Sequence, residues 1–281
     1  MKIINNQSGI AHLVLIVGIV FALIFGVIGA TYIRMTDAAV TMVNVGTYNL
    51  RSQRWDGQSK TIPNWAARKS LVQAYITAEK PGIIGMQEVI AQNPDNKKAS
   101  PQRSDVVTFM NKLGYYGQVG SATNSSPLFW RSANFTQYDA GEVLIYNSAT
   151  SKRVDPPASR FLTYARLNQH NRNETIMVFN YHFNQFEQQS AQLNKLGQTI
   201  ATIYNRNKQD SLVLTGDLNG YHGKIITELK KYGITLRVSD GNTTVDHVLI
   251  SKNVAVRSWT SSGPGSPPAS DHPLIVSKLS L

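Results

Sequence analysis

The stretch Leu212-Val213-Leu214-Thr215-Gly216-Asp217-Leu218-Asn219-Gly220 joins an apolar run to a short polar segment. Its apolar residues are typical of a buried strand. Asp217 and Asn219 stand two positions apart, so in an extended backbone their side chains project from the same side. Gly216 lets the backbone turn and approach a neighbour closely. A carboxylate and an amide on one side can orient water or hold a phosphate oxygen, although an Asx-rich turn is the commoner origin of such a segment.

Other polar residues follow or interrupt expected strands along the chain, in the order Asn49, Glu88, His182, Asp246, Asp271 and His272. A carboxylate inside a strand, as at Asp246, is costly to bury unless it is paired. His272 is its natural partner, because a carboxylate fixes the tautomer of a histidine and stabilises the imidazolium. His247 follows Asp246 directly and points to the opposite face of the strand, so it is predicted to be structural.

Glu88, Asn49 and Asp271 offer oxygen ligands only. Such ligands suit Mg²⁺ or Mn²⁺ better than zinc. Each residue alone is more often a solvated strand end than a functional group. Together, a hard-metal ligand set, a phosphate cradle and a carboxylate-oriented histidine are what metal-assisted attack of water on a phosphate ester needs.

The pattern of apolar residues predicts one domain over residues 40–281. Helices are expected at 63–79, 104–113, 186–204 and 224–232, and strands at 41–49, 83–87, 128–131, 142–146, 161–167, 175–181, 211–215, 245–250, 254–259 and 274–276. The strands outnumber the helices and fall into two groups with helices interleaved. This order predicts two packed mixed sheets with helices outside them.

The amino-terminal residues 1–39 carry a membrane signal. Residues 13–30 form an uninterrupted run of 18 apolar residues and glycines, flanked by Lys2 and Arg34. At about 1.5 Å rise per residue this is a marginal bilayer span. The run is longer than the core of most cleaved signal peptides, which favours an uncleaved signal-anchor helix with the domain outside the cytoplasm. The alternative is cleavage near Thr36-Asp37-Ala38-Ala39 and secretion.

Net charge indicates the kind of binding partner, and the cysteine content excludes some kinds of chemistry. The chain has 28 basic and 17 acidic residues, for a net charge of +11. Only Lys2, Arg34 and Asp37 are charged before residue 40, so the domain keeps a net charge of +10. A basic surface favours polyanions such as nucleic acid or acidic lipid headgroups. The absence of cysteine excludes disulfides, thiolate nucleophiles and cysteine-ligated zinc.

Over residues 41–279 the chain resembles the endonuclease/exonuclease/phosphatase superfamily, the deoxyribonuclease I-like fold. The segments that carry the resemblance are Tyr48-Asn49-Leu50, Gln87-Glu88, Phe129-Trp130-Arg131, Asn180-Tyr181-His182-Phe183, Gly216-Asp217-Leu218-Asn219, Val245-Asp246-His247 and Ser270-Asp271-His272. The resemblance implies a four-layer α/β/β/α sandwich with the active site at the top of its two central sheets. It also implies Glu88 as the main metal ligand, supported by Asn49 and Asp271.

The resemblance implies roles for five further residues. Asp217 and Asn219 would hold the attacking water and the phosphate. His272 would be the general base, oriented by Asp246. His182 would contact the scissile phosphate and stabilise charge in the transition state.

Two kinds of substrate fit these observations. A membrane-anchored or secreted nuclease acting on DNA or RNA would use the basic surface, since contacts from lysine and arginine to phosphate dominate nucleic-acid affinity. The basic residues expected to line such a groove are Arg51, Arg54, Lys60, Arg131, Lys152, Arg153 and Arg160. The alternative is a phosphodiesterase or phosphatase acting on lipid headgroups or small phosphate esters. No obligate protein partner is expected, and a binding module without catalysis is the weakest hypothesis, because every matched catalytic position carries the expected residue type.

Overall fold

The chain divides into two compact units, Met1–Thr41 and Met42–Leu281. The computed structural model describes residues 42–92, 99–120, 126–147, 159–170, 172, 174–184, 189–207, 210–241, 245–263 and 265–281, all in the second unit. The expected membrane helix at residues 13–30 lies outside these ranges. None of the helices within them has the length and apolar character that a membrane crossing needs.

The described strands form two mixed sheets of six strands each. The first contains β1 (Met42–Asn49), β2 (Ile83–Gln87), β3 (Tyr115–Gln118), β4 (Leu128–Arg131), β11 (Ala255–Ser262) and β12 (Leu274–Ser280). Its order is β11-β12-β1-β2-β4-β3. Strand β1 pairs in parallel with β2 and antiparallel with β12, so the two ends of the domain meet at the centre of this sheet.

The second sheet contains β5 (Phe135–Tyr146), β6 (Arg160–Gln169), β7 (Thr175–His182), β8 (Ser211–Asp217), β9 (Leu236–Val238) and β10 (Asp246–Ser251). Its order is β5-β6-β7-β8-β10-β9. Strands β7 and β8 run in parallel, and β10 runs antiparallel to β8. The short strands β3 and β9 were not expected from the sequence.

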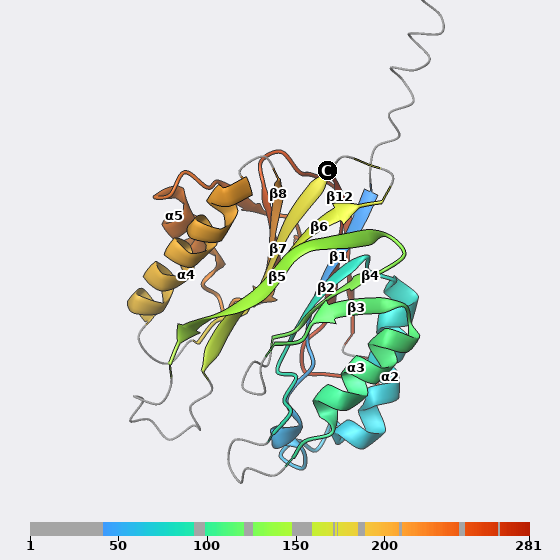
Figure 1. Cartoon of the computed structure of the whole chain (residues 1–281). Coiled ribbons are helices and arrows are strands. Elements are labelled where there is room, and N and C mark those ends of the chain that lie inside the picture. Colours follow the sequence, from blue (N-terminus) through green and yellow to red (C-terminus); the bar gives the residue numbers. More distant parts are fainter. Residues whose placement is uncertain are drawn as a thin grey trace, which may run out of the picture. The chain divides into compact units, whose positions relative to one another are not determined.

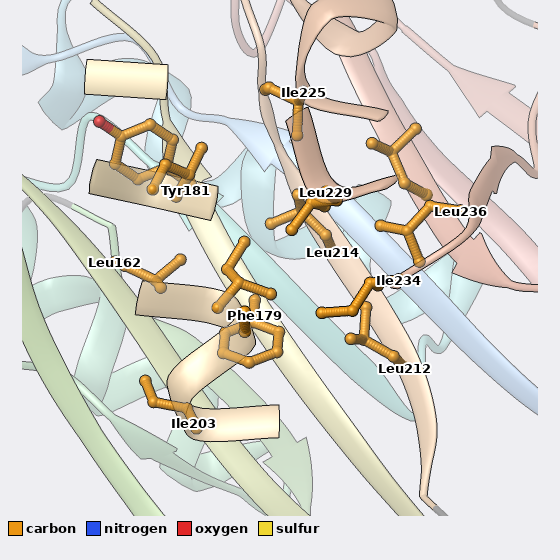
Figure 2. Packing of buried hydrophobic residues seen from close by; sticks show 14 of the residues in the cluster. Leu162, Phe179, Tyr181, Ile203, Leu212, Leu214, Ile225, Leu229, Ile234 and Leu236 are labelled. Atoms are coloured by element: carbon orange, nitrogen blue, oxygen red, sulfur yellow. The ribbon is translucent and has the colours of Figure 1, made fainter. Parts of the chain in front are cut away.

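Helices cover the outer face of each sheet (Figure 1). The helices are α2 (Trp65–Glu79), α3 (Gln102–Lys112), α4 (Gln189–Tyr204) and α5 (His222–Lys230), with short 3-10 turns η1 (Gln53–Trp55) and η3 (Asn205–Asn207). Apolar side chains of α2 and α3 pack on the first sheet, and those of α4 and α5 on the second. Figure 2 shows this second packing, in which Phe179 and Leu214 of the sheet gather with Leu229 of α5. A third apolar cluster fills the space between the sheets, which confirms the expected sandwich of two mixed sheets between helices.

The residues between the sheets change from apolar to polar along each central strand. In β1, Val43 and Val45 belong to the core between the sheets, and Asn49 follows on the same face at the strand's end. Alternation along a strand repeats this pattern in β7, where Ile176 and Val178 precede His182, and in β8, where Val213 precedes Asp217. Strand β10 runs the other way and begins with its polar residue, Asp246. The register therefore brings the polar ends together, with Asp217 opposite both His182 and Asp246.

Candidate active site

Asn49 links the two sheets at this polar end. Its side-chain nitrogen Nδ2 donates to Oδ2 of Asp217 at 2.9 Å and to Oε1 of Glu88 at 3.2 Å. Its oxygen Oδ1 accepts from the backbone nitrogen of Arg51 at 2.9 Å, which holds the amide in this orientation. The other oxygen of Glu88 accepts from the backbone nitrogen of Ser52 at 2.8 Å. One buried amide thus holds a carboxylate from each sheet in place.

Asp246 and His272 form a hydrogen-bonded pair beside Asp217. The distance from Nδ1 of His272 to Oδ2 of Asp246 is 2.7 Å, and Nε2 lies 4.0 Å from Oδ2 of Asp217. Burial lowers the pKa of His272, but the hydrogen bond to Asp246 and the charges of Asp246, Asp217 and Asp271 outweigh it and raise the pKa to about 9. Burial also raises the pKa of Asp246, and the hydrogen bond from His272 opposes that effect. The arrangement has the geometry of a carboxylate-oriented base.

Asp217 is almost fully buried and faces several groups. Burial, followed by the charge of Asp246, raises its pKa to about 6, although His272 and the bonds from Asn49 and Asn219 act against the increase. The backbone nitrogen of Asn219 donates to Oδ1 of Asp217 at 3.1 Å. The Asn219 side chain instead donates to the carbonyl of Phe183 at 2.8 Å. Asn219 thus fixes the Asp217 carboxylate through its backbone and the end of β7 through its side chain.

His182 is held as a neutral imidazole. Its Nε2 lies 3.4 Å from Oδ2 of Asp217. Burial, then the charges of Arg160 and His272, keep the pKa of His182 well below its usual range. Its Nδ1 is buried and has no hydrogen-bond partner among the described residues. The same holds for Nε of Arg160, at the start of β6.

The backbone is strained at three places around the site. Arg51, Glu88 and Asn219 have φ values of 54°, 61° and 47°, in the left-handed region that non-glycine residues seldom adopt. Each lies beside a hydrogen bond already described. Strain of this kind costs about 1–3 kcal/mol per residue and gathers at functional sites, where surrounding contacts over-determine the conformation.

Asp271 lies at the exposed side of the site and pairs with Arg51. The distance from Nη1 of Arg51 to Oδ2 of Asp271 is 2.6 Å. The neighbouring Ser270 donates from its hydroxyl to the backbone carbonyl of Asn49 at 2.7 Å. The structure thus places Asp271 next to the end of β1, with an arginine on its carboxylate. A role for Asp271 as a metal ligand stays a prediction and would require this ion pair to open.

Arg68 of α2 is a buried residue that sequence analysis missed. Its guanidinium donates to the backbone carbonyls of Leu50 and Arg51 and, at 3.1 Å, to that of Ala269. It therefore ties the end of β1 to the loop that delivers Asp271 and His272. Burial lowers its pKa, and the charge of Asp56 opposes that effect. Its place on the apolar stripe of α2, three residues after Trp65, was the available signal.

A network of buried hydrogen bonds between the two sheets lies next to the site. Nε2 of Gln87 donates to Oδ1 of Asn180 at 2.7 Å, and Thr215 donates to the same oxygen at 3.2 Å. Gly85 makes room for this network, since a Cβ there would lie 2.1 Å from the Thr215 hydroxyl and 2.5 Å from Oδ1 of Asn180. Gly216 is needed for a similar reason, because its Cβ would meet the carbonyl of Tyr181 at 2.0 Å.

Only some of the expected basic residues lie near the site. The backbone nitrogen of Arg54 in η1 donates to the side chain of Ser52, and the charge of Arg54 acts on Arg160, which in turn interacts with Glu88 and Asp217. Arg131 lies away from this part of the site. Its neighbour Trp130 pairs with Ile83, the first residue of β2. Gln87 and Glu88 lie at the last residue of β2 and just after it, so Arg131 is at the opposite end of this strand. Lys152 and Arg153 lie outside the described residues, and Lys60 is exposed.

A family model described as the Endonuclease/Exonuclease/phosphatase family matches residues 46–272. The chain belongs to this family. It is accordingly a phosphoester hydrolase, and the resemblance carried by its short motifs is confirmed. No curated protein shows significant sequence similarity to it.

Solved structures of the family share the fold at low sequence identity. An endonuclease/exonuclease/phosphatase from Bacteroides vulgatus is 18% identical, with a TM-score of 0.68 over 86% of this chain and 99% of that one. The human nocturnin catalytic domain with bound sulfate is 19% identical, with a TM-score of 0.65 over 85% and 94%. A mannosyl-6-phosphatase from Bacteroides thetaiotaomicron is 17% identical, with a TM-score of 0.63 over 85% and 100%. Because these proteins differ in what their names describe, the likeness establishes the fold and leaves the substrate open.

Proposed function

We propose that this chain is a metal-dependent phosphodiesterase that cleaves DNA or RNA by attack of a water molecule activated by His272. The observation that carries the proposal is the continuous set of contacts from Asp246 through His272 and Asp217 to Asn49 and Glu88. This set joins a base, its orienting carboxylate and two further carboxylates at one end of the sandwich.

The reaction forms one bond and breaks one bond at phosphorus. Water, positioned by the Asp217 carboxylate, attacks the phosphate while Nε2 of His272 takes its proton. The Nδ1 hydrogen bond to Asp246 stabilises the resulting imidazolium. The bond to the leaving oxygen breaks as the new bond forms, and the leaving oxygen takes up a proton from solvent. His182, held neutral, can donate a hydrogen bond to a phosphate oxygen without adding charge.

The donor groups present fit Mg²⁺ or Mn²⁺. Glu88 and Asp217 converge on a single amide, the side chain of Asn49, so two carboxylates from different sheets lie close together. Glu88 offers the hard oxygen ligand that these ions prefer. Asn49 would add its oxygen only after its side-chain amide turned over, because Nδ2 faces Glu88 and Asp217 and Oδ1 accepts from Arg51. When bound there, the cation would offset charge on the phosphate and disfavour the imidazolium of His272.

A second arrangement of ligand atoms also exists. Atoms of Asp217, Asp246 and His272 lie within 4.8 Å of one another, which is close enough for a shared cation. We assign this cluster to proton transfer, because Nδ1 of His272 already bonds to Asp246 and only Nε2 remains. Loss of hydrolysis in excess EDTA, restored by Mg²⁺ or Mn²⁺, is expected under either arrangement.

The choice of nucleic acid as substrate rests on arginines at the site and on the charge of the domain. Arg160 interacts with both Glu88 and Asp217, Arg54 acts on Arg160, and Arg51 pairs with Asp271 at the exposed side of the site. A polyanion's neighbouring phosphates would pass these arginines. The domain's net charge of +10 adds a field that attracts nucleic acid. The alternative, a small phosphate ester or lipid headgroup, needs only the central groups. We also propose that residues 13–30 anchor the chain to a membrane, with the domain outside the cytoplasm.

Paired arginine variants would distinguish the substrates. The full chain with Mg²⁺ would be assayed on supercoiled plasmid, single-stranded RNA and a p-nitrophenyl phosphate ester over a range of salt concentrations. Arg160→Gln should weaken nucleic-acid binding and reduce its salt dependence by about one phosphate contact, whereas Arg131→Gln at the opposite end of the sheet should change neither. Hydrolysis of the small ester alone, with intact plasmid and RNA, would favour the alternative.

A further inference from the structure

Two histidines meet on the face of β10 that points away from the active site. His247 of β10 and His222, the first residue of α5, have ring centroids 4.2 Å apart and ring planes inclined by 56°. His247 is 1% exposed. Its Nε2 and the Nδ1 of His222 are both buried and without a hydrogen-bond partner among the described residues. Leaving two buried ring nitrogens unsatisfied costs free energy that a ligand would recover.

Asp240 fixes the state of His247. One carboxylate oxygen lies 3.1 Å from Nδ1 of His247, and the other accepts from the backbone nitrogen of Val248 at 2.8 Å. A carboxylate at Nδ1 places the ring proton there and leaves a lone pair on Nε2. This carboxylate–histidine pairing is the usual outer partner of a metal-binding imidazole.

His222 contributes a second buried nitrogen beside this ring. The residue as a whole is half-buried, but its Nδ1 is buried and its ring lies against that of His247. Burial and the neighbouring His247 lower the pKa of His222, against a smaller opposing effect of Asp240. A neutral imidazole is the form that binds metal.

We propose that His222 and His247 bind one late transition-metal ion of the zinc class, with water completing its coordination. Imidazole nitrogen suits Zn²⁺, Ni²⁺, Co²⁺ and Cu²⁺ and discriminates against Mg²⁺. With metal–nitrogen bonds of about 2.0 Å and tetrahedral angles, two imidazole centroids stand about 5 Å apart. The observed 4.2 Å requires a small outward movement of His222, which its partly exposed position at a helix start allows.

One of the two histidines also reaches the surface. His222 is half-buried and lines a shallow cavity of about 470 Å³ over α5. Two lysines share this cavity, but Nζ of Lys224 lies over the ring of Tyr221 at 4.6 Å and Lys231 pairs with Glu228 at 2.5 Å. An ion bound here would tie α5 to the strand whose first residue is Asp246. The site is separate from the Mg²⁺ ligands and independent of the proposed substrate.

The test is titration of the untagged full chain with Ni²⁺ or Zn²⁺ by calorimetry, after EDTA treatment and in excess Mg²⁺. We expect one site that His222→Gln removes and that His272→Gln and His170→Gln retain. His170 is a matched control because its ring already bonds to Thr136 and to the carbonyl of Ala133. Asp240→Asn should weaken binding by about 10–100-fold without removing a ligand.

A second measurement does not depend on a variant. Zn²⁺ should shift the Nε2 resonance of His247 in the wild-type chain and raise its Tm, and the Tm increase should be absent in His222→Gln. Wild-type affinity in His222→Gln would overturn the proposal, as would loss of all transition-metal binding in His272→Gln, since the ion would then belong to the catalytic cluster. An unchanged Nε2 resonance at saturating Zn²⁺ would overturn it equally.

Discussion

Replacing Asp246 with asparagine should lower the pKa of His272 sharply. The pKa rises from an ordinary 6.5 to about 9 chiefly through the hydrogen bond and charge of Asp246, which act against burial. That increase corresponds to about 3 kcal/mol of preference for the imidazolium. Solvent reaches the 21% exposed side chain, so this is an upper value. Asparagine keeps the size of the side chain and removes its charge, so the pKa should fall toward 6.5.

The change has a defined effect on stability. The folded pKa of His272 lies above the unfolded value, so its stabilisation is fully present below pH 6.5 and is lost as the pH rises through about 9. The free energy of unfolding of the metal-free wild type should therefore exceed that of Asp246→Asn most at pH 6. At pH 10 the difference between the two proteins should be smaller, by up to about 3 kcal/mol.

Two assays check this reasoning. Nuclear magnetic resonance would follow the His272 ring through a pH titration of both proteins, and urea unfolding would be measured at pH 6 and pH 10. His170, whose ring contacts Thr136 and the carbonyl of Ala133 and not the Asp246 carboxylate, is followed in the same spectra for comparison. A His272 that titrates near 6.5 in the wild type, or near 9 in Asp246→Asn, would refute the account of the pair.

Three other substitutions probe the site's construction. Burial raises the pKa of Asp217 from 3.8 to about 6, so the cost of its charge to folding develops between these pH values and is complete at pH 8. Asp217→Asn should therefore stabilise the metal-free protein by up to about 3 kcal/mol at pH 8 while hydrolysis is lost, as calorimetry and turnover would show. Gly85→Ala places a Cβ 2.1 Å from the Thr215 hydroxyl and should destabilise by about 1–3 kcal/mol in urea unfolding, so wild-type stability would contradict the packing. Arg68→Met leaves three backbone carbonyls without their donor, at about 1–3 kcal/mol each, and should lower Tm; a Tm equal to wild type would show that water replaces the guanidinium.

Much of the architecture was predictable because the spacing of apolar residues along the sequence indicates which face of an element is buried. The strand at 128–131 and the long helix before Tyr204 follow from apolar periodicity. The strand expected at 142–146 extends back to Phe135, since β5 lies at a sheet edge where half-exposed residues lose a clear alternation. Strands β3 and β9 are four and three residues long, too short for a pattern to emerge.

The site was predictable in its members and less so in its contacts. Pairing of Asp246 with His272 followed from the cost of a carboxylate inside a strand, and the structure contains it. That Asn49 would hold carboxylates from two sheets depends on register between segments 168 residues apart, which no local signal carries. For the same reason the sequence did not separate Arg160, beside the site, from Arg131 at the opposite end of its sheet.

The central claim is that His272, oriented by Asp246, activates water for phosphodiester hydrolysis. It is tested most directly by the rate at which the full chain nicks supercoiled plasmid in Mg²⁺, compared with His272→Gln and with the His170→Gln control. The account predicts nicking by the wild type and the control and a loss of at least about 100-fold in His272→Gln, the usual contribution of a general base. Equal rates in His272→Gln and the wild type would contradict it.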